Sequence, residues 1–181
     1  MGKNKIYTAV ALGFFDGVHL GHQSIIKETV KYEAKNIIPV VYTFKQSPKE
    51  IINGKPCFYL TTNSQKIKLL LSFGIKKVYM DDFKNIKNLS CEEFIHKIIS
   101  EKLNAKYVIC GENYFFGHKA EGNCEKLKDI CKKYSIKTQI VPLKTYKDKS
   151  ISSTRIKDSI KFQEFQDIQQ MLGRKIDKNH L

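Results

Sequence analysis

The stretch IYTAVALGFFDGVHLGHQSII, residues 6–26, decides the fold because it joins a strand, a glycine-containing loop and a helix. Residues 6–12 alternate loosely and are rich in β-forming side chains, which predicts a strand. Between this strand and the helix, GFFDGVHLGH (13–22) places glycines at four-residue intervals around one carboxylate and two histidines. A loop of that composition directly after a strand is typical of a ligand site.

The rest of the chain repeats the alternation of strand and helix. Further strands are predicted at 37–44, 77–80, 107–110 and 136–143, and helices at 20–35, 62–74, 90–103, 121–134 and 153–172, with a long loop after the second strand. Thr62 with Gln65, and Ser90 with Glu93, have the spacing of capping boxes. Strands alternating with helices predict an α/β, Rossmann-like parallel sheet of about five strands with helices on both faces. We expect residues 1–181 to form a single domain.

Composition narrows the class of protein. The net charge is +14, but the basic residues are nearly all lysines spread along the chain, so nucleic acid is not the expected main partner. The positive field should instead attract small anions such as phosphates. No apolar run is long enough for a membrane span, and no export signal is evident, so we expect a cytoplasmic protein. The five cysteines include no C-x-x-C pair, which argues against a zinc or disulfide framework.

In an open parallel sheet, ligands bind beyond the carboxyl ends of the strands. The segments that follow the predicted strands are therefore expected to meet along one rim. They are residues 13–22, 44–48 (FKQSP), 81–83 (DDF), 111–117 (GENYFFG) and the stretch leading to 151–155 (ISSTR).

The loop 13–22 has the features of a phosphate cradle. His19 and His22 lie three residues apart at the start of a predicted helix, where free N–H groups favour an anion, and Gly21 between them allows close approach. The chain contains neither a P-loop nor a G-x-G-x-x-G motif. A metal site would need a third ligand, for which His118 is the available residue, and we predict no metal-ligating set.

Two other rim segments have both a structural and a functional interpretation. Ser152, Ser153 and Thr154 either cap a helix or bind phosphate together with Arg155, whose fork of donors suits phosphate oxygens. The aromatic side chains of GENYFFG either anchor a loop in the core or form a pocket wall, with Asn113 supplying a directional amide.

Taken in order and spacing, GFFDGVHLGH, TFKQSP, GENYFFG and ISSTRI resemble the FAD synthetase (FMN adenylyltransferase) module of the bacterial bifunctional riboflavin kinase/FAD synthetase family. The first and last motifs also resemble the wider H-x-G-H nucleotidyltransferase superfamily. This resemblance implies a Rossmann-like nucleotidyltransferase fold and the reaction of FMN with ATP to give FAD and pyrophosphate, with Mg²⁺. The family's protein usually continues into a riboflavin kinase domain, whereas this sequence ends at Leu181. We therefore expect no riboflavin kinase activity from these residues.

The resemblance also assigns roles to residues. It implies His19, His22 and Arg155 as catalytic phosphate contacts. It implies an ATP site formed by Gly13, Phe14, Phe15, Asp16, Gly21, Ser152, Ser153 and Thr154. It implies a flavin and nucleotide pocket lined by Phe44, Ser47, Pro48, Gly111, Asn113, Tyr114 and Phe116. The FMN phosphate is itself the nucleophile, so catalysis would rest on alignment and charge stabilisation.

Three alternatives to this function stay open. The family usually has Asn at the position of Phe14 and a Pro-His-Pro-like segment at Gln46-Ser47-Pro48, so another phosphorylated acceptor is the first alternative. A non-catalytic nucleotide- or flavin-binding protein is the second, although an abandoned site need not keep His19, His22 and Arg155. A basic nucleic-acid-binding protein is the third. The oligomeric state is not determined by the sequence.

Overall fold

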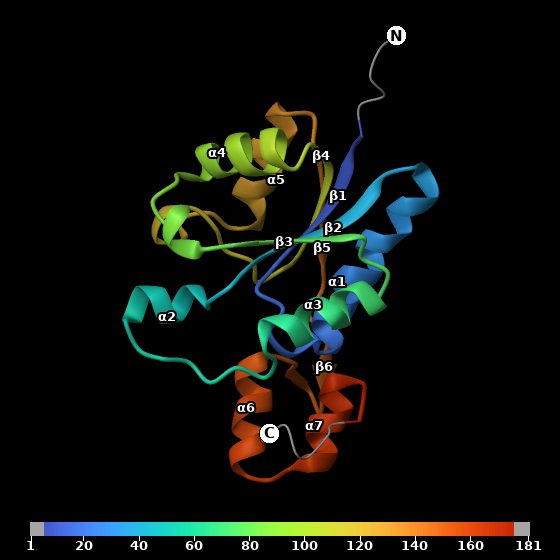
Figure 1. The fold of residues 1–181 in the computed structure, drawn as a ribbon, viewed down its shortest axis with the longest axis vertical. Helices are drawn as coiled ribbons and strands as arrows, with labels where there is room; N and C mark the ends of the chain where they lie inside the picture. The colour runs from blue at the N-terminus through green and yellow to red at the C-terminus, as the bar shows by residue number, and fades with distance from the viewer. Residues whose placement is uncertain (1–5, 176–181) are drawn as a thin grey trace.

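The computed structural model describes residues 6–175, which form a five-stranded parallel sheet with helices on both faces (Figure 1). The strands are β1 (Thr8–Leu12), β2 (Ile38–Phe44), β3 (Lys77–Asp81), β4 (Ala105–Gly111) and β5 (Lys137–Val141). Their spatial order is β3-β2-β1-β4-β5, and every neighbouring pair is parallel. The predicted fold class is confirmed.

The central strand β1 determines where a ligand can bind. It is buried along its whole length, and Val10 pairs with Val40 of β2 on one side and with Val108 of β4 on the other. The chain adds β2 and β3 on one side of β1 and then crosses to add β4 and β5 on the other. The direction of winding therefore switches between β1 and β4, and the crevice beyond their carboxyl ends is the expected ligand site.

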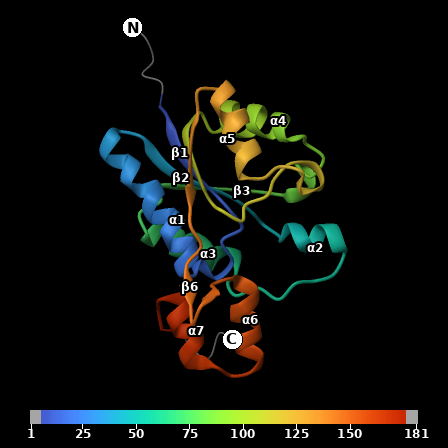
Figure 2. The same ribbon diagram turned by 180° about the vertical axis from the view of Figure 1, so that it is seen from behind.

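The two faces of the sheet have separate hydrophobic cores. α1 (Leu20–Val30) and α3 (Asn63–Ser72) cover one face, where Ile26 and Leu70 join Ala9 and Ala11 of β1. α4 (Cys91–Glu93), its π-helical continuation η4 (Phe94–Lys102) and α5 (Cys124–Lys133) cover the other face, around Leu12. Figure 2 shows the same division from behind. The side chains of β1 alternate between the two cores, as the pleat requires.

The last helices form a third cluster at the end of the molecule toward which β1 runs (Figure 1). α6 (Ser153–Lys161), α7 (Phe165–Leu172) and the hairpin of β6 (Thr145–Tyr146) with β7 (Lys149–Ser150) enclose apolar side chains that include Ile156, Ile168 and Met171. Since this cluster lies beyond the carboxyl edge of the sheet, it provides one wall of the predicted rim.

Several elements differ from the sequence prediction. The helix predicted at 153–172 is two helices, α6 and α7, separated at Gln163, whose φ of 57° is left-handed. The apolar pattern continues through this break because both helices bury side chains in the same cluster. The helix predicted at 20–35 ends as an α-helix at Val30, and its last turn is the 3₁₀ helix η2 (Lys31–Lys35).

The segments predicted as loops also contain short elements. α2 (Pro48–Asn53) begins with a proline, which suits the first turn of a helix, and interrupts the loop after β2. The other short helices are η1 (Asp16–Val18), η3 (Phe83–Asn85) and η5 (His118–Ala120). Between residues 6 and 175, no helix combines the length and the apolar character needed to cross a membrane.

Both predicted capping boxes are present, and the one at Ser90 provides a test of helix stability. Ser90 Oγ accepts the N–H of Glu93 at 3.2 Å, and the Glu93 carboxylate accepts the N–H of Ser90 at 3.0 Å. We expect Ser90→Ala to lower the free energy of unfolding by about 1 kcal/mol, because the first turn loses a cap. Urea denaturation measures the change.

Ser100→Ala is the matched control, since Ser100 lies inside η4 and caps no helix. Its expected effect stays within about 0.5 kcal/mol. Equal losses in the two variants would show that the capping box contributes nothing.

Candidate active site

A cavity of about 710 Å³ opens beyond the carboxyl ends of β1 and β4. Its size lies in the range of small-molecule sites. Each of the five predicted rim segments contributes to its lining, with Phe83 as the contribution of DDF. The residues predicted for a ligand that do line it are Gly13, Phe14, Asp16, His19, Gly21, His22, Phe44, Ser47, Pro48, Gly111, Asn113, Tyr114, Phe116, Ser152, Ser153 and Thr154. Phe15 and Arg155 do not.

The loop after β1 has a strained backbone that packing holds in place. Phe15, Gly17 and Val18 all have positive φ, at 58°, 77° and 41°. For a β-branched residue such as Val18 this conformation is a genuine outlier, and each such non-glycine residue costs about 1–3 kcal/mol. The side chains of Phe15 and Val18 are fully buried in the core beside β1. Phe15, implied as an ATP contact, therefore lies beneath the loop and outside the cavity lining.

Asp16 joins three segments around the cavity. Its carboxylate accepts the N–H groups of Leu60 at 2.9 Å and Thr61 at 3.3 Å, and pairs with Lys157 Nζ at 2.8 Å. Its carbonyl oxygen accepts the hydroxyl of Ser153 at 2.9 Å. The Asp16 side chain is 2% exposed, so the two N–H groups and the Lys157 ammonium offset part of the cost of burying its charge. Asp16 thus organises the site through contacts within the protein.

His19 and His22 form a stacked pair at the start of α1. Their ring centroids are 3.6 Å apart with an interplanar angle of 19°. His19 is the N-cap residue of α1, and its Nδ1 accepts the N–H of His22 at 3.4 Å. A neutral imidazole that accepts at Nδ1 carries its proton at Nε2, so His19 has an N–H left to donate.

Both imidazoles are held in the neutral form. Burial, with the charge of Arg174, lowers the pKa of His19 to about 4. Burial also lowers the pKa of His22 well below its usual value, and His19 and Lys66 add to the effect. His22 Nδ1 is buried and has no hydrogen-bond partner within residues 6–175. The pair can therefore offer directional hydrogen bonds to an anion at the start of a helix, where the helix dipole favours negative charge.

Lys66 is a buried cation behind the loop, and sequence reasoning missed it. Its Nζ donates to the carbonyl oxygens of Phe14 at 3.3 Å and Phe44 at 3.0 Å, and lies 4.2 Å from the centroid of the Phe14 ring. Lys66 thereby joins the ends of β1 and β2. Its position on α3, one turn before the buried Leu70, was the available signal, because a lysine on the apolar face of a helix needs a specific partner.

The start of α6 adds hydroxyls and a cation to the cavity. Ser152 caps the helix by accepting the N–H of Arg155 at 3.2 Å, so the structural interpretation of this hydroxyl holds. The guanidinium of Arg155 donates to the carbonyl oxygens of Tyr146 at 2.8 Å and Lys149 at 2.7 Å, which closes the β6–β7 hairpin. Lys157 does line the cavity. Lys157 was not among the predicted site residues, although it lies four residues from Ser153 on the same helix face.

The loop after β4 anchors aromatic side chains in the core and also lines the cavity. Phe116 is buried, and its ring centroid lies 5.8 Å from that of Phe94. This contact anchors the loop in the core. The Tyr114 ring stacks with that of Phe116, with the ring centroids 6.0 Å apart. Burial raises the pKa of the Tyr114 hydroxyl. All three line the cavity together with Asn113. The aromatic anchors are therefore also a wall of the site.

Tyr59 closes the segment that leads from β2 to α3, and it too was missed. Its hydroxyl accepts the N–H of Ser47 at 3.0 Å and donates to the carboxylate of Glu50. Burial and Glu50 raise the pKa of Tyr59 to about 12. The centroid of the Tyr59 ring lies 5.9 Å from that of the Phe14 ring. Gln46-Ser47-Pro48 is therefore tied to the first loop through a residue that the motifs do not include.

The chain is similar to known proteins over most of its length. A family model described as FAD synthetase matches residues 2–155. The bifunctional riboflavin kinase/FMN adenylyltransferase of Buchnera aphidicola subsp. Schizaphis graminum is 37% identical over 171 residues, 92% of this chain and 55% of the relative. The FAD synthetase of Listeria monocytogenes is 27% identical over 174 residues, 94% of this chain and 70% of the relative.

A solved structure is also similar to this chain. The crystal structure of a Streptococcus pneumoniae protein, described as a macrolide-efflux protein, has a TM-score of 0.83 and 28% identity, covering 95% of this chain and 58% of that chain. The chain spans about half the length of the bifunctional relatives that it matches.

The lowered pKa of the buried Lys66 predicts that the stability of the protein depends on pH. Burial lowers its pKa from 10.5 to about 8, opposed by the charge of Asp16. Between these two pH values the unfolded chain binds more protons than the folded chain, so stability rises with pH there. We expect the unfolding free energy of the wild type, minus that of Lys66→Met, to rise by about 2–3 kcal/mol across this window.

Urea denaturation at a series of pH values measures this difference. Lys68→Met, which removes an exposed lysine from the same helix, is the matched control. An equal rise for Lys68→Met, or no rise for Lys66→Met, would contradict the assignment.

Proposed function

Because the chain belongs to the FAD synthetase family, we propose that it transfers AMP from ATP to FMN, giving FAD and pyrophosphate. The observation that carries the proposal is the convergence, in one cavity, of the His19–His22 pair at the start of α1 with the start of α6 and Lys157. Two helix N-termini and a cation facing one space suit a polyphosphate.

In the proposed reaction, an oxygen of the FMN phosphate attacks the α-phosphorus of ATP. The new P–O bond forms as the bond to the β-phosphate oxygen breaks, and pyrophosphate leaves with the electron pair. The phosphate is already a nucleophile, so the protein needs no covalent intermediate. Its work is to align the two phosphates and to stabilise the charge that develops on their oxygens.

Individual residues have distinct proposed roles. His19 and His22 donate hydrogen bonds to phosphoryl oxygens as neutral imidazoles, so they orient the phosphates without a change of protonation. Lys157 brings an ammonium group from α6 to the cavity, where it also pairs with Asp16. Contact of Arg155 with phosphate remains a prediction, and it would require the guanidinium to leave the Tyr146 and Lys149 carbonyls.

We propose that the flavin occupies the apolar part of the cavity. Ile51 and Ile52 of α2, Phe83 of η3 and Phe115 after β4 line this part. Phe115 and Ile52 are 61% and 66% exposed, so a planar ring system would cover apolar surface there. Asn113, Tyr114 and Phe116 would lie between the flavin and the nucleotide.

Mg²⁺ is proposed to enter as the complex of ATP. The described residues contain no group of three or more His, Cys, Asp or Glu side chains placed to hold a metal ion. Asp16 is the carboxylate among the cavity residues, and Lys157 and two backbone N–H groups already engage it. Since Mg²⁺ is commonly bound through substrate phosphates, no dedicated protein site is required. We propose a cytoplasmic location, in line with the five unpaired thiols.

The proposed function is tested by incubating the purified chain with ATP, Mg²⁺ and FMN and separating the flavins by chromatography. We expect FAD to form from FMN. Riboflavin in a parallel reaction should yield no dinucleotide, because it lacks the attacking phosphate. ATP binding without any FAD would overturn the proposed acceptor and implicate the Gln46-Ser47-Pro48 segment in choosing another.

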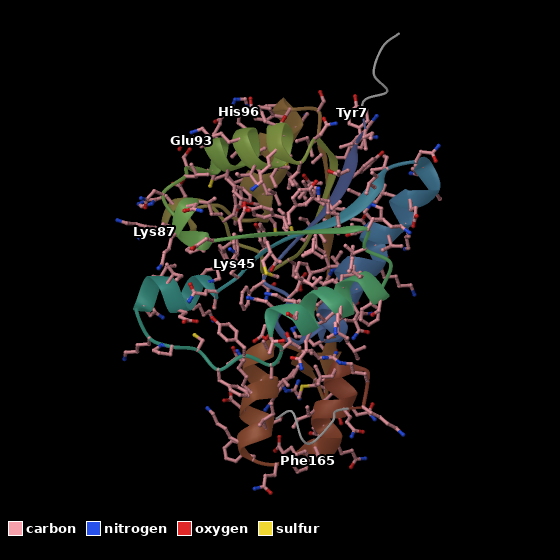
Figure 3. All side chains as sticks on the ribbon, in the orientation of Figure 1. Tyr7, Lys45, Lys87, Glu93, His96 and Phe165 are labelled. Carbon is pink, nitrogen blue, oxygen red and sulfur yellow. The ribbon has the colours of Figure 1, made fainter. Side chains whose placement is uncertain are left out.

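Replacing His22 tests the phosphate cradle. We expect His22→Ala to lower kcat roughly 10²–10³-fold, as loss of a charge-stabilising donor does elsewhere. The fold should stay intact, and the thermal midpoint is measured in parallel because the His22 ring packs against His19 and Phe15. His96→Ala is the control: His96 is 48% exposed and lies at the end of the molecule far from α6 and α7 (Figure 3). A folded His22→Ala protein with the turnover of the wild type would disprove the cradle.

A further inference from the structure

The carbonyl oxygens of the strained turn before His19 are bound by a residue far away in the sequence. Arg174 Nη2 donates to the carbonyl oxygen of Gly17 at 2.6 Å, and Nη1 donates to that of Val18 at 3.2 Å. The planar fork of a guanidinium suits two neighbouring acceptors in a way that an ammonium group does not. Arg174 lies outside the residues matched by the family model, which end at 155.

A second side chain completes this attachment. Gln23 Nε2, from the first turn of α1, donates to the carbonyl oxygens of Val18 at 2.9 Å and Leu172 at 2.8 Å. The C-terminal end of α7 is therefore joined to the N-terminal end of α1. Gly173 permits this approach because its φ of 65° is left-handed and because it lies against Leu20, the first residue of α1.

These contacts bear directly on the histidine pair. Val18 is bonded covalently to His19, the N-cap residue, and its positive φ turns the chain into α1. A positive φ at a β-branched residue persists only when its surroundings over-determine it. The buried side chain holds one side of Val18, and Arg174 with Gln23 holds its carbonyl oxygen on the other. The half-buried guanidinium is also close enough to oppose a positive charge on His19.

We propose that Arg174 is a positioning residue for AMP transfer, which holds the Gly17–Val18 turn so that His19 and the start of α1 face the nucleotide phosphates. This inference rests on the proposed function. Arg174 does not line the cavity, so it acts through the turn and not on the substrate. The segment after α7 thereby becomes part of the active-site support.

The test replaces Arg174 with alanine and measures FAD formation and ATP affinity. We expect kcat/KM to fall about 10- to 100-fold, because displacing aligned groups by about 1 Å has effects of this size. Millimolar guanidinium chloride should restore part of the activity by entering the vacated space, whereas sodium chloride at equal concentration should not. Lys175→Ala, which removes the neighbouring exposed charge, is the matched control and should behave like the wild type.

Loss of activity without rescue would overturn the inference, because the contacts to the Gly17 and Val18 carbonyl oxygens would then not be what the substitution removed. A kcat/KM within twofold of the wild type would overturn it as well. Arg174→Lys is the second variant, for use if the alanine variant does not fold. Lysine keeps the positive charge but lacks the fork of donors, so we expect a loss of kcat/KM between those of the wild type and Arg174→Ala. Full activity of Arg174→Lys would contradict the inference.

The wild type separates this inference from the proposed function. If the wild type binds ATP but forms no FAD, the proposed function fails. The inference then depends on the ATP dissociation constant measured by calorimetry, which should be about tenfold weaker for Arg174→Ala. Equal ATP affinity of the two proteins would overturn it. Absence of ATP binding by the wild type would overturn both.

Discussion

The buried carboxylate of Asp16 is the contact on which the cavity depends. It receives two backbone N–H groups from the segment before α3 and the ammonium of Lys157 from α6, while the carbonyl oxygen of the same residue receives the Ser153 hydroxyl. Three segments far apart in the sequence are thus placed by one residue. Removing one partner of such a pair leaves a buried charge unpaired, which is why this arrangement is stable only when complete.

The chemistry of the site follows from burial. His19 and His22 are neutral because desolvation and neighbouring positive charge oppose protonation. They can therefore act as oriented hydrogen-bond donors. Formal positive charge at the cavity belongs to lysines, among them Lys157, and the helix N-termini add partial positive charge. Lys66 and Arg174 remain behind the loop, bonded to its carbonyl oxygens. Lys157 thus both pairs with Asp16 and lines the cavity, whereas Lys66 and Arg174 lie outside the cavity lining.

Local pattern predicted much of the structure. Strand positions, both capping boxes and the gathering of the rim segments followed from periodicity, cap spacing and the rule for parallel sheets. The prediction was wrong about a single final helix, because a shared apolar cluster hides the break at Gln163. It also did not separate Phe15, which faces the core, from Phe14, which faces the cavity, since adjacent residues in a strained turn follow no period.

The fold class, the family and the edge of the sheet at which the cavity opens could be predicted from the sequence, because these depend on short-range pattern and on motifs of contiguous residues. The folded structure was needed to show that Asp16 pairs with Lys157, that Arg155 closes a hairpin, and that Tyr59, Lys66 and Arg174 support the loops. These contacts join residues up to 157 positions apart. Their formation depends on burial and on the direction of each side chain, which exist only once the layers have packed.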